Sequence, residues 1–383
     1  MLKSPRMRKQ RCACLAPALL VAAVGLATAQ LTGAASAAPD GRAVGGPQLV
    51  VSGHGFGQGL GLSQWGAEER AAAGQTTGRI LRFYYPGTAI GFTRTRSVRV
   101  LLAKLTRVFV GSTGAIELRD AANHVRSLPP GRHLFTALAA RSSPAAFPVR
   151  LTTSGALLTV NGTSYHGALT LIRSGRRLEV VNEVPLELYV ADVVSSECPG
   201  SWLPAALRGQ AVASRTFAVA NLRPGRQFDL YADDRSQNYR GMSKEFPSAL
   251  AAAAATRSQI LLFKGQIIDA FFSASDGGRT NDSVGAWGIG RLPYLVSRPD
   301  PFDALSPDLD WGPVSIPLPE LGRLFPRLPR SIAAVTLVRN DAGRAARIVF
   351  TSTEGRSVAL DGYVFQQRTG LRSTYLSSVR VES

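Results

Sequence analysis

Glu197 is the residue whose type and setting in this sequence most directly suggest chemistry. It follows an apolar run at 189–194 and precedes a Pro-Gly turn and the start of a helix. We predict that the run is a buried strand, which would place Glu197 at a strand-to-helix junction near the lip of a sheet. Partial burial there would raise the pKa of its carboxyl enough for general acid catalysis. A carboxylate that only caps the helix fits the same position, because negative charge is favoured near a helix N-terminus.

Trp202 lies shortly after Glu197 in the sequence. An indole there would form an apolar wall that disfavours the ionised carboxylate, or a flat surface on which a sugar ring stacks. Trp202 is therefore a candidate substrate-binding residue.

A helix rich in small apolar residues is expected over about 204–221, because a proline suits its first turn and an Arg-Pro-Gly sequence ends it. Such a helix is expected to be buried, and buried polar side chains need hydrogen-bond partners. Gln210 and Ser214 share one face of it. Arg215 could hold a carboxylate, either that of Glu197 or one on a substrate. A structural network in the core is consistent with the same spacing.

The second unusual stretch is "GHGFGQGLGLSQWG" at 53–66. Its glycines alternate strictly, but leucine occupies 60 and 62, so the dinucleotide-binding fingerprint fails, and no phosphate-binding loop is present. The glycines allow positive φ angles or a close approach of the backbone. The block also carries groups that a polysaccharide cleft would use, namely His54, Gln58, Ser63, Gln64 and Trp65. A tightly packed turn that seats the next helix, with His54 satisfied structurally, is the alternative.

The third stretch is "FFSASDGGRTND" at 271–282, in which Ser273, Ser275 and Asp276 precede a Gly-Gly turn. We expect a loop at a sheet edge, where binding groups are often found. No Gly-x-Ser-x-Gly elbow supports a serine hydrolase. The four histidines, at 54, 124, 133 and 166, lack the spacing of a metal-binding motif, so no metal site is predicted.

The elements that must position these residues indicate an α+β class, because strands and helices do not follow one another as regular βαβ units. Besides the helix already described, helices are expected over "LSQWGAEERAAAG" and 245–258, and a hairpin around 341–343. The expected segments, of which 49–383 should form one integrated unit, are a signal peptide at 1–37, a linker at 38–48, a Gly-rich block at 49–95, a mainly β segment at 96–182 and a core at 183–383.

The N-terminus has the three parts of a secretory signal peptide. A basic stretch precedes an apolar region at 15–28, and a small-x-small cleavage site follows at 35–37. An uncleaved anchor is less favoured, because the apolar part is shorter than the roughly 20 residues of a spanning helix. No later segment is apolar enough to span a bilayer. We therefore expect a secreted, extracytoplasmic protein with no stable membrane insertion after cleavage of the leader.

The net charge is +18, and removing the five basic residues of the leader leaves 39 Lys and Arg against 26 Asp and Glu, or +13. The arginines are scattered and form no basic run, so we predict no nucleic-acid partner. An anionic wall or membrane surface suits such a protein, although arginine that only confers solubility would give the same balance. Cys198 is the single cysteine outside the leader, which excludes a disulfide framework.

Several ordered blocks resemble the stage II sporulation protein D/LytB (amidase enhancer) family. The strongest is "VNEVPLELYVADVVSSECPGSWLPAALRGQAVASRTFAVAN", and the others are "SQNYRGMSKE", "FFSASDGGRTND", "PYLVSRPDP" and "TGLRSTYL". The resemblance implies a two-lobed fold with mixed sheets, in which a central Ala-rich helix borders a glycan cleft. It makes 183–383 the catalytic core and bacterial peptidoglycan the substrate. Sporulation members are lytic transglycosylases, and LytB-type members are described as amidase enhancers.

Carried over by position, the resemblance implies that Glu197 is the catalytic glutamate. The other matched motif positions are candidate substrate-binding residues, to which His54 and Trp202 are added: Gln210, Arg215, Gln237, Tyr239, Ser273 and Ser275.

The sequence departs from the family pattern in four places. Cys198 stands where Met or Ile is usual, and Asp276 stands where many members have Cys. Some members bind zinc through His and Cys in the loop that here reads "FDLYADDRSQNYRG", which has neither, so we expect no zinc and no cofactor. The Gly-rich block precedes the core here, whereas it follows the core in sporulation members.

The implied reaction needs a single carboxylate, because the C6 hydroxyl of muramic acid attacks C1 in place of water. Glu197 would protonate the glycosidic oxygen and then accept the hydroxyl proton. Glycan strands, and an amidase that is stimulated, are the expected partners. A non-catalytic amidase enhancer is one alternative. The other is a hydrolase with Asp192, Glu187 or Asp300 as second carboxylate.

Overall fold

The computed structural model describes residues 46–137, 146–288 and 290–382. The signal peptide and most of the linker expected from the sequence lie outside these residues. Residues 46–383 cluster into one compact unit. Strands, helices and several separate sheets make it an α+β protein, as the sequence predicts.

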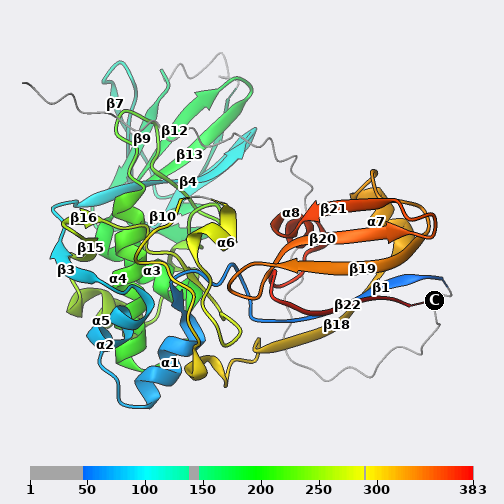
Figure 1. Cartoon of the computed structure of the whole chain (residues 1–383). Coiled ribbons are helices and arrows are strands. Elements are labelled where there is room, and N and C mark those ends of the chain that lie inside the picture. Colours follow the sequence, from blue (N-terminus) through cyan, green and yellow to red (C-terminus); the bar gives the residue numbers. More distant parts are fainter. Residues whose placement is uncertain (1–45, 138–145, 289, 383) are drawn as a thin grey trace, which may run out of the picture. The chain divides into compact units, whose positions relative to one another are not determined.

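The largest sheet has seven strands in the order β14-β4-β13-β12-β9-β6-β7 (Figure 1). A second sheet has four strands in the order β11-β10-β5-β8, and these strands fall between strands of the large sheet along the sequence. Alternate side chains of both sheets, such as Val108, Ile116 and Leu171, enter one hydrophobic core, so the two sheets pack on each other. The strands are β4 (Ser97–Leu105), β5 (Arg107–Ser112), β6 (Ile116–Arg119), β7 (Val125–Leu128), β8 (Gly131–Thr136), β9 (Val149–Thr153), β10 (Leu158–Val160), β11 (Thr163–Tyr165), β12 (Ala168–Ser174), β13 (Arg177–Pro185) and β14 (Leu230–Tyr231).

Helix α3 (Leu186–Glu197) follows β13 directly, so the buried strand predicted at 189–194 is wrong. The run is apolar on all sides because α3 packs against the large sheet, α4 (Pro204–Ala220) and α5 (Pro247–Ala255) together. Burial on every side removes the helical period from the sequence, and a short apolar run is then compatible with either structure. Glu197 is consequently the last residue of a helix and not the first residue after a strand.

Helix α4 is buried on two sides, and its bounds agree with the helix predicted at 204–221. One face, with Leu207 and Ala211, packs with α3 and α5. The other, with Val212 and Ala213, packs with helices and short strands from both ends of the sequence. These are β2 (Leu62–Ser63), α1 (Gln64–Ala72), α2 (Thr77–Tyr84), β15 (Gln259–Phe263), β17 (Phe272–Ser273) and α6 (Ser283–Trp287). Strands β3 (Thr88–Phe92) and β16 (Gln266–Ile267) lie on either side of β15 in one sheet, and two short 3₁₀ helices are present, η1 (Gly241–Lys244) and η2 (Pro301–Asp303).

The C-terminal part is built on two three-stranded sheets with a common core. Strand β1 (Gln48–His54) lies between β18 (Asp310–Pro317) and β22 (Leu376–Glu382), antiparallel to both (Figure 1). The second sheet has the order β19 (Ile332–Arg339), β20 (Ala345–Ser352), β21 (Ser357–Asp361), and α7 (Leu318–Leu324) and α8 (Gly362–Thr369) complete this part. The hairpin predicted around 341–343 is confirmed as the turn between β19 and β20. Among the described helices, none has the length and apolar character needed to cross a membrane.

Four of the alternating glycines before α1, namely Gly55, Gly57, Gly59 and Gly61, have positive φ angles and lie close to other segments. At Gly59, with φ of +72°, a β-carbon would come within 2.1 Å of the buried guanidinium of Arg344. That guanidinium donates to the carbonyl of Asp276 (2.7 Å), so it has little freedom to move away. The close approach expected from the glycines is present at this position.

We predict that Gly59→Ala destabilises the protein by about 2–5 kcal/mol, because left-handed backbone strain of about 1–2 kcal/mol adds to a clash in a packed interior of about 1–3 kcal/mol. The matched control is Gly74→Ala, with φ of +76° and no atom within 4 Å of the added carbon. Only the strain applies there, so urea denaturation should give a loss of about 1–2 kcal/mol. Equal losses in the two variants would show that Arg344 does not restrict this position.

Candidate active site

The carboxyl group of Glu197 is partly buried at the C-terminal end of α3 and is held by two segments distant in sequence. Asn238 donates to Oε1 from both its backbone and its side-chain nitrogen, each at 3.1 Å. Gln64, at the start of α1, donates to Oε2 through Nε2 (3.3 Å). The Gly-rich block and the loop before η1 thus meet at this carboxyl, and both partners are neutral amides.

Burial raises the pKa of the Glu197 carboxyl above its ordinary value of 4.5. The hydrogen bonds from Asn238 and Gln64 favour the ionised form and offset part of that effect, as does the charge of exposed Arg240. The desolvation effect is the largest of these, so the carboxyl keeps its proton to a higher pH than a solvated glutamate does. This is the property that a general acid requires.

Two tryptophans join the start of α1 to the turn between α3 and α4. Trp65 and Trp202 meet edge to face with ring centroids 5.2 Å apart, and the Trp202 side chain is buried in the core around α3. Of the two uses predicted for Trp202, its burial is consistent with the apolar wall and leaves little ring surface for a sugar.

Glu68 is a second carboxylate in this region that sequence reasoning did not single out. It lies on α1, one helical turn after Gln64, and accepts a hydrogen bond from the backbone nitrogen of Leu203 (2.9 Å). Burial raises the pKa of Glu68, and burial together with the charges of Glu197 and Glu68 raises the pKa of Cys198. These effects disfavour the thiolate of Cys198, which is the nucleophilic form of a cysteine.

Four of the predicted substrate-binding residues lie inside the protein, packed around helices α3 and α4. Gln210 donates to Ser214 Oγ (3.1 Å), and Gln237 donates to the Tyr189 hydroxyl (3.1 Å). Tyr239 donates to Asn182 Oδ1 (2.7 Å). With Arg215, which is described next, these side chains support the site from within and expose at most 2% of their surface.

Arg215 is fully buried and pairs with Glu187, not with Glu197 as the sequence allowed. Its Nη2 lies 2.5 Å from Glu187 Oε2, and its remaining donors reach backbone carbonyls of α5 and β15 and the Thr256 hydroxyl. The alternative of a structural network in the core matches this geometry. Because the guanidinium of Arg215 pairs with Glu187, it does not lower the pKa of the Glu197 carboxyl.

Ser275 and its neighbours hold the start of α1. Asp303, in η2, accepts hydrogen bonds from the hydroxyls of Ser63 (2.7 Å) and Ser275 (2.5 Å). Ser63 in turn caps α1 by accepting from the Gly66 nitrogen. Ser273 lies beside Gly57, and a β-carbon on that glycine would come within 2.7 Å of it. Ser275, through Asp303 and Ser63, thus holds the start of α1 and with it Gln64, while buried Ser273 pairs with Ser63 through strands β17 and β2.

His54 belongs to the C-terminal part. Its Nδ1 lies 2.5 Å from Asp310 Oδ1, and its ring meets Tyr375 edge to face at 5.1 Å. These contacts are with β18 and the segment before β22, and they match the alternative in which His54 is satisfied structurally.

The carboxylates considered as a second catalytic acid are all occupied or enclosed. Glu187 pairs with Arg215, and Asp300 accepts from Arg70 (2.7 Å) and from the Tyr84 hydroxyl (2.6 Å). Asp192 is fully buried, and burial followed by the adjacent Glu245 raises its pKa to about 8. None of the three forms a hydrogen bond to Glu197 in the described structure.

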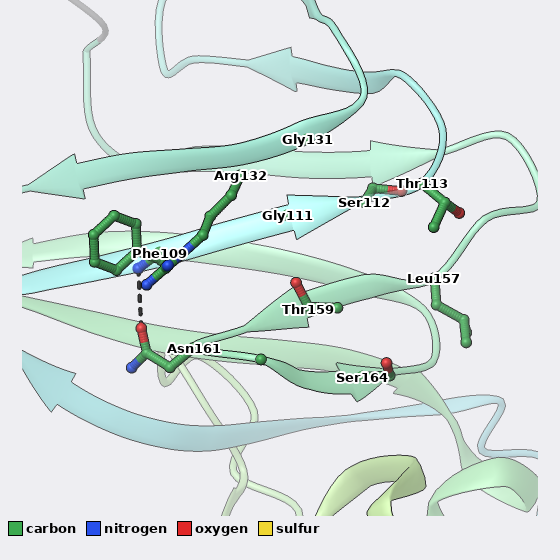
Figure 2. A pocket seen from close by; sticks show the side chains of 11 residues that line it. Phe109, Gly111, Ser112, Thr113, Gly131, Arg132, Leu157, Thr159, Asn161 and Ser164 are labelled. Atoms are coloured by element: carbon green, nitrogen blue, oxygen red, sulfur yellow. Dashed lines mark hydrogen bonds between the residues drawn. The ribbon is translucent and has the colours of Figure 1, made fainter.

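A pocket of about 480 Å³ opens on the four-stranded sheet, and Glu197 does not line it (Figure 2). Small residues such as Gly111 and Thr159 form its floor, and the guanidinium of Arg132 covers the ring of Phe109 at 3.6 Å. Figure 2 shows Asn161 hydrogen-bonded to the backbone of Phe109 at one end (3.0 Å). Arg132 therefore occupies one face of Phe109, on which a sugar ring could otherwise stack.

Comparison with known proteins identifies relatives of the segment that carries Glu197. Residues 174–263 match the family model described as stage II sporulation protein. An uncharacterised protein of Brachyspira hyodysenteriae is 37% identical over 143 residues, 36% of this chain and 38% of the relative. Stage II sporulation protein D of Bacillus amyloliquefaciens is 35% identical over 144 residues, 33% of this chain and 42% of the relative. The amidase enhancer of Bacillus subtilis is 51% identical over 43 residues, 11% and 6% of the two chains. The matched segments thus span about two fifths of the first two relatives.

We predict that Glu197→Gln becomes more stable relative to the wild type as the pH rises. A folded-state pKa above the unfolded value stabilises the wild type at low pH, and this contribution is lost as the pH rises through the folded pKa. The difference in Tm, variant minus wild type, should therefore increase from about pH 4 to about pH 8. Glu354→Gln, at an exposed turn residue, is the control and should give a difference that does not vary with pH. A difference that falls with pH for Glu197→Gln would mean that its carboxyl is stabilised as the anion.

Proposed function

Because this chain belongs, through its residues 174–263, to the stage II sporulation protein D/LytB family, we propose that it is an exported peptidoglycan-remodelling enzyme. The reaction is that of a lytic transglycosylase. It cleaves peptide-free glycan strands between N-acetylmuramic acid and N-acetylglucosamine and leaves 1,6-anhydromuramic ends.

The observation that carries this proposal is the setting of Glu197. Its carboxyl is partly desolvated, its pKa is raised, and its two partners are amides that can donate to either oxygen without supplying a positive charge. Asn238 and Gln64 also fix the orientation of the carboxyl, which a proton transfer in a defined direction requires.

In the proposed reaction, Glu197 donates its proton to the glycosidic oxygen, and the bond between that oxygen and C1 of muramic acid breaks. The C6 hydroxyl of the same muramic acid forms the new bond to C1 and gives its proton to the Glu197 carboxylate. The enzyme returns to its starting protonation state, and no water is consumed. One carboxylate therefore suffices, in contrast to the pair that most glycosidases use. This agrees with the pairing of Glu187 and Asp300 with other side chains and with the complete burial of Asp192.

We propose that the glycan lies across the C-terminal end of α3, in a cleft bordered by α4 and between two lobes of the fold. The start of α1 and the loop that carries Asn238 and Arg240 reach Glu197 from two segments of the chain. In this proposal the glycan substrate passes between these two segments. Exposed Arg240 would contact the acidic lactyl groups of peptide-free strands. Such strands arise when an amidase removes the stem peptides, so an amidase is the expected functional partner.

We predict that the purified protein converts peptide-free glycan strands into fragments that end in 1,6-anhydromuramic acid. Mass spectrometry should show that each such fragment is lighter by one water than the hydrolysis product of the same cut. Glu197→Gln should reduce the rate by at least about 100-fold, because general acid–base catalysis contributes about 10²–10⁴-fold. Glu354→Gln, exposed on the turn after β20, is the control and should retain the rate.

Three other results would each contradict the proposal. Intact strands together with acceleration of an added amidase would assign the protein to the amidase enhancers and make Glu197 a contact residue. Products with a reducing end and one added water would indicate a hydrolase. Normal cleavage by Glu197→Gln would move the acid to another residue.

A further inference from the structure

His166, Asp192 and Glu245 meet at a point that the sequence does not reveal. His166 lies in the turn between β11 and β12, Asp192 on α3, and Glu245 directly after η1. One ligand atom from each lies within 4.8 Å of the others. Within this group, His166 Nε2 and Glu245 Oε2 are 2.8 Å apart.

Asp192 shows that the group is incomplete without a further partner. Its side chain is fully buried, and by geometry neither carboxylate oxygen accepts a hydrogen bond from the described residues. The nearby hydroxyl of Tyr239 donates instead to Asn182 Oδ1 (2.7 Å). A buried carboxylate without a donor is costly, and a second carboxylate beside it adds repulsion. Either a cation or a shared proton must offset this.

The geometry favours a cation. Zn²⁺ binds imidazole nitrogen and carboxylate oxygen at about 2.0–2.2 Å, which places neighbouring ligands of a tetrahedral site roughly 3.3 Å apart. One ligand atom from each of the three side chains lies within 4.8 Å of the others, so side-chain rotations that bring these atoms to that spacing would complete the site. We propose that His166 Nε2, Asp192 and Glu245 bind one divalent transition-metal ion of the Zn²⁺ type, with solvent in the fourth position.

The ligand types select among metals. An imidazole with two carboxylates suits Zn²⁺ and its neighbours, whereas Ca²⁺ and Mg²⁺ take six or more oxygen ligands. The ion can enter from the solvent side, because the side chains of His166 and Glu245 are 17% and 13% exposed while Asp192 closes the base of the site.

The proposed ion would cross-link three segments that converge near Glu197. Asp192 is on the helix that ends at Glu197, and Glu245 follows the loop that supplies Asn238. Binding would therefore fix the loop against α3. This role is structural and does not depend on the reaction proposed above, so the test measures metal binding and not glycan cleavage.

We predict that the purified chain, stripped with a chelator and dialysed, takes up one Zn²⁺ per molecule with a rise in Tm, and that Co²⁺ gives a visible absorption band of a four-coordinate site. Ca²⁺ at the same concentration should produce neither effect. His166→Gln and Asp192→Asn should each weaken Zn²⁺ binding by more than about 100-fold, since loss of an outer-shell partner alone costs about 10–100-fold.

The matched control is His124→Gln. His124 also pairs with a carboxylate, Asp120, at 3.2 Å, but no third ligand completes that pair among the described residues, so its loss should leave Zn²⁺ binding unchanged. Circular dichroism checks that each variant is folded, and Glu245→Gln replaces Asp192→Asn if the latter fails to fold.

The proposal is overturned if the wild type takes up no stoichiometric Zn²⁺, or if His166→Gln binds it equally well, because the ion would then be held elsewhere. It is also overturned if Zn²⁺ leaves Tm unchanged while Asp192→Asn raises it. That pair of results would show that a proton shared between Asp192 and Glu245 neutralises the buried carboxylate.

Discussion

Two buried aspartates hold helix α1 in place, and the geometry around Glu197 depends on them. Asp303 accepts from Ser63 at the start of the helix, and Asp300 accepts from Arg70 near its end. Arg70 and Asp300 form a buried ion pair, and removing one partner of such a pair leaves an uncompensated charge and costs about 3–5 kcal/mol. The helix that supplies Gln64 is thus fixed from a segment more than 200 residues away, and the Gly-rich block and the later loops act as one unit.

The interior separates positive charge from the candidate acid. Arg215 is the nearest buried arginine in the sequence to Glu197, but Glu187, at the other end of the same helix, takes up its guanidinium. Amides contact Glu197 instead, and burial then has the largest effect on its pKa. Had the arginine faced Glu197, it would have lowered the pKa and removed the proton that the proposed reaction needs.

Local signals in the sequence were sufficient for some elements and not for others. The proline and the small residues of 204–221 predicted α4, and the turn at 341–343 predicted its hairpin. Helix α3 was missed because uniform burial removes periodicity. Glu197 was identified from its neighbours, but Asn238 and Glu68 are brought near it only by tertiary packing. The same holds for His166, Asp192 and Glu245, which carry no motif spacing.

The pairing of strand β1 can take place only after strands much later in the sequence have been made. It begins at Gln48, and both of its hydrogen-bonding edges are filled by strands near the other end of the chain, β18 and β22. While the chain is being made, an apolar strand with two open edges must wait for more than 250 residues before either partner exists. Open edges of this kind invite pairing with other chains. Among the described strands, the first in the sequence is therefore one of the last to be paired, and its edges stay open to other chains until β18 and β22 have been made.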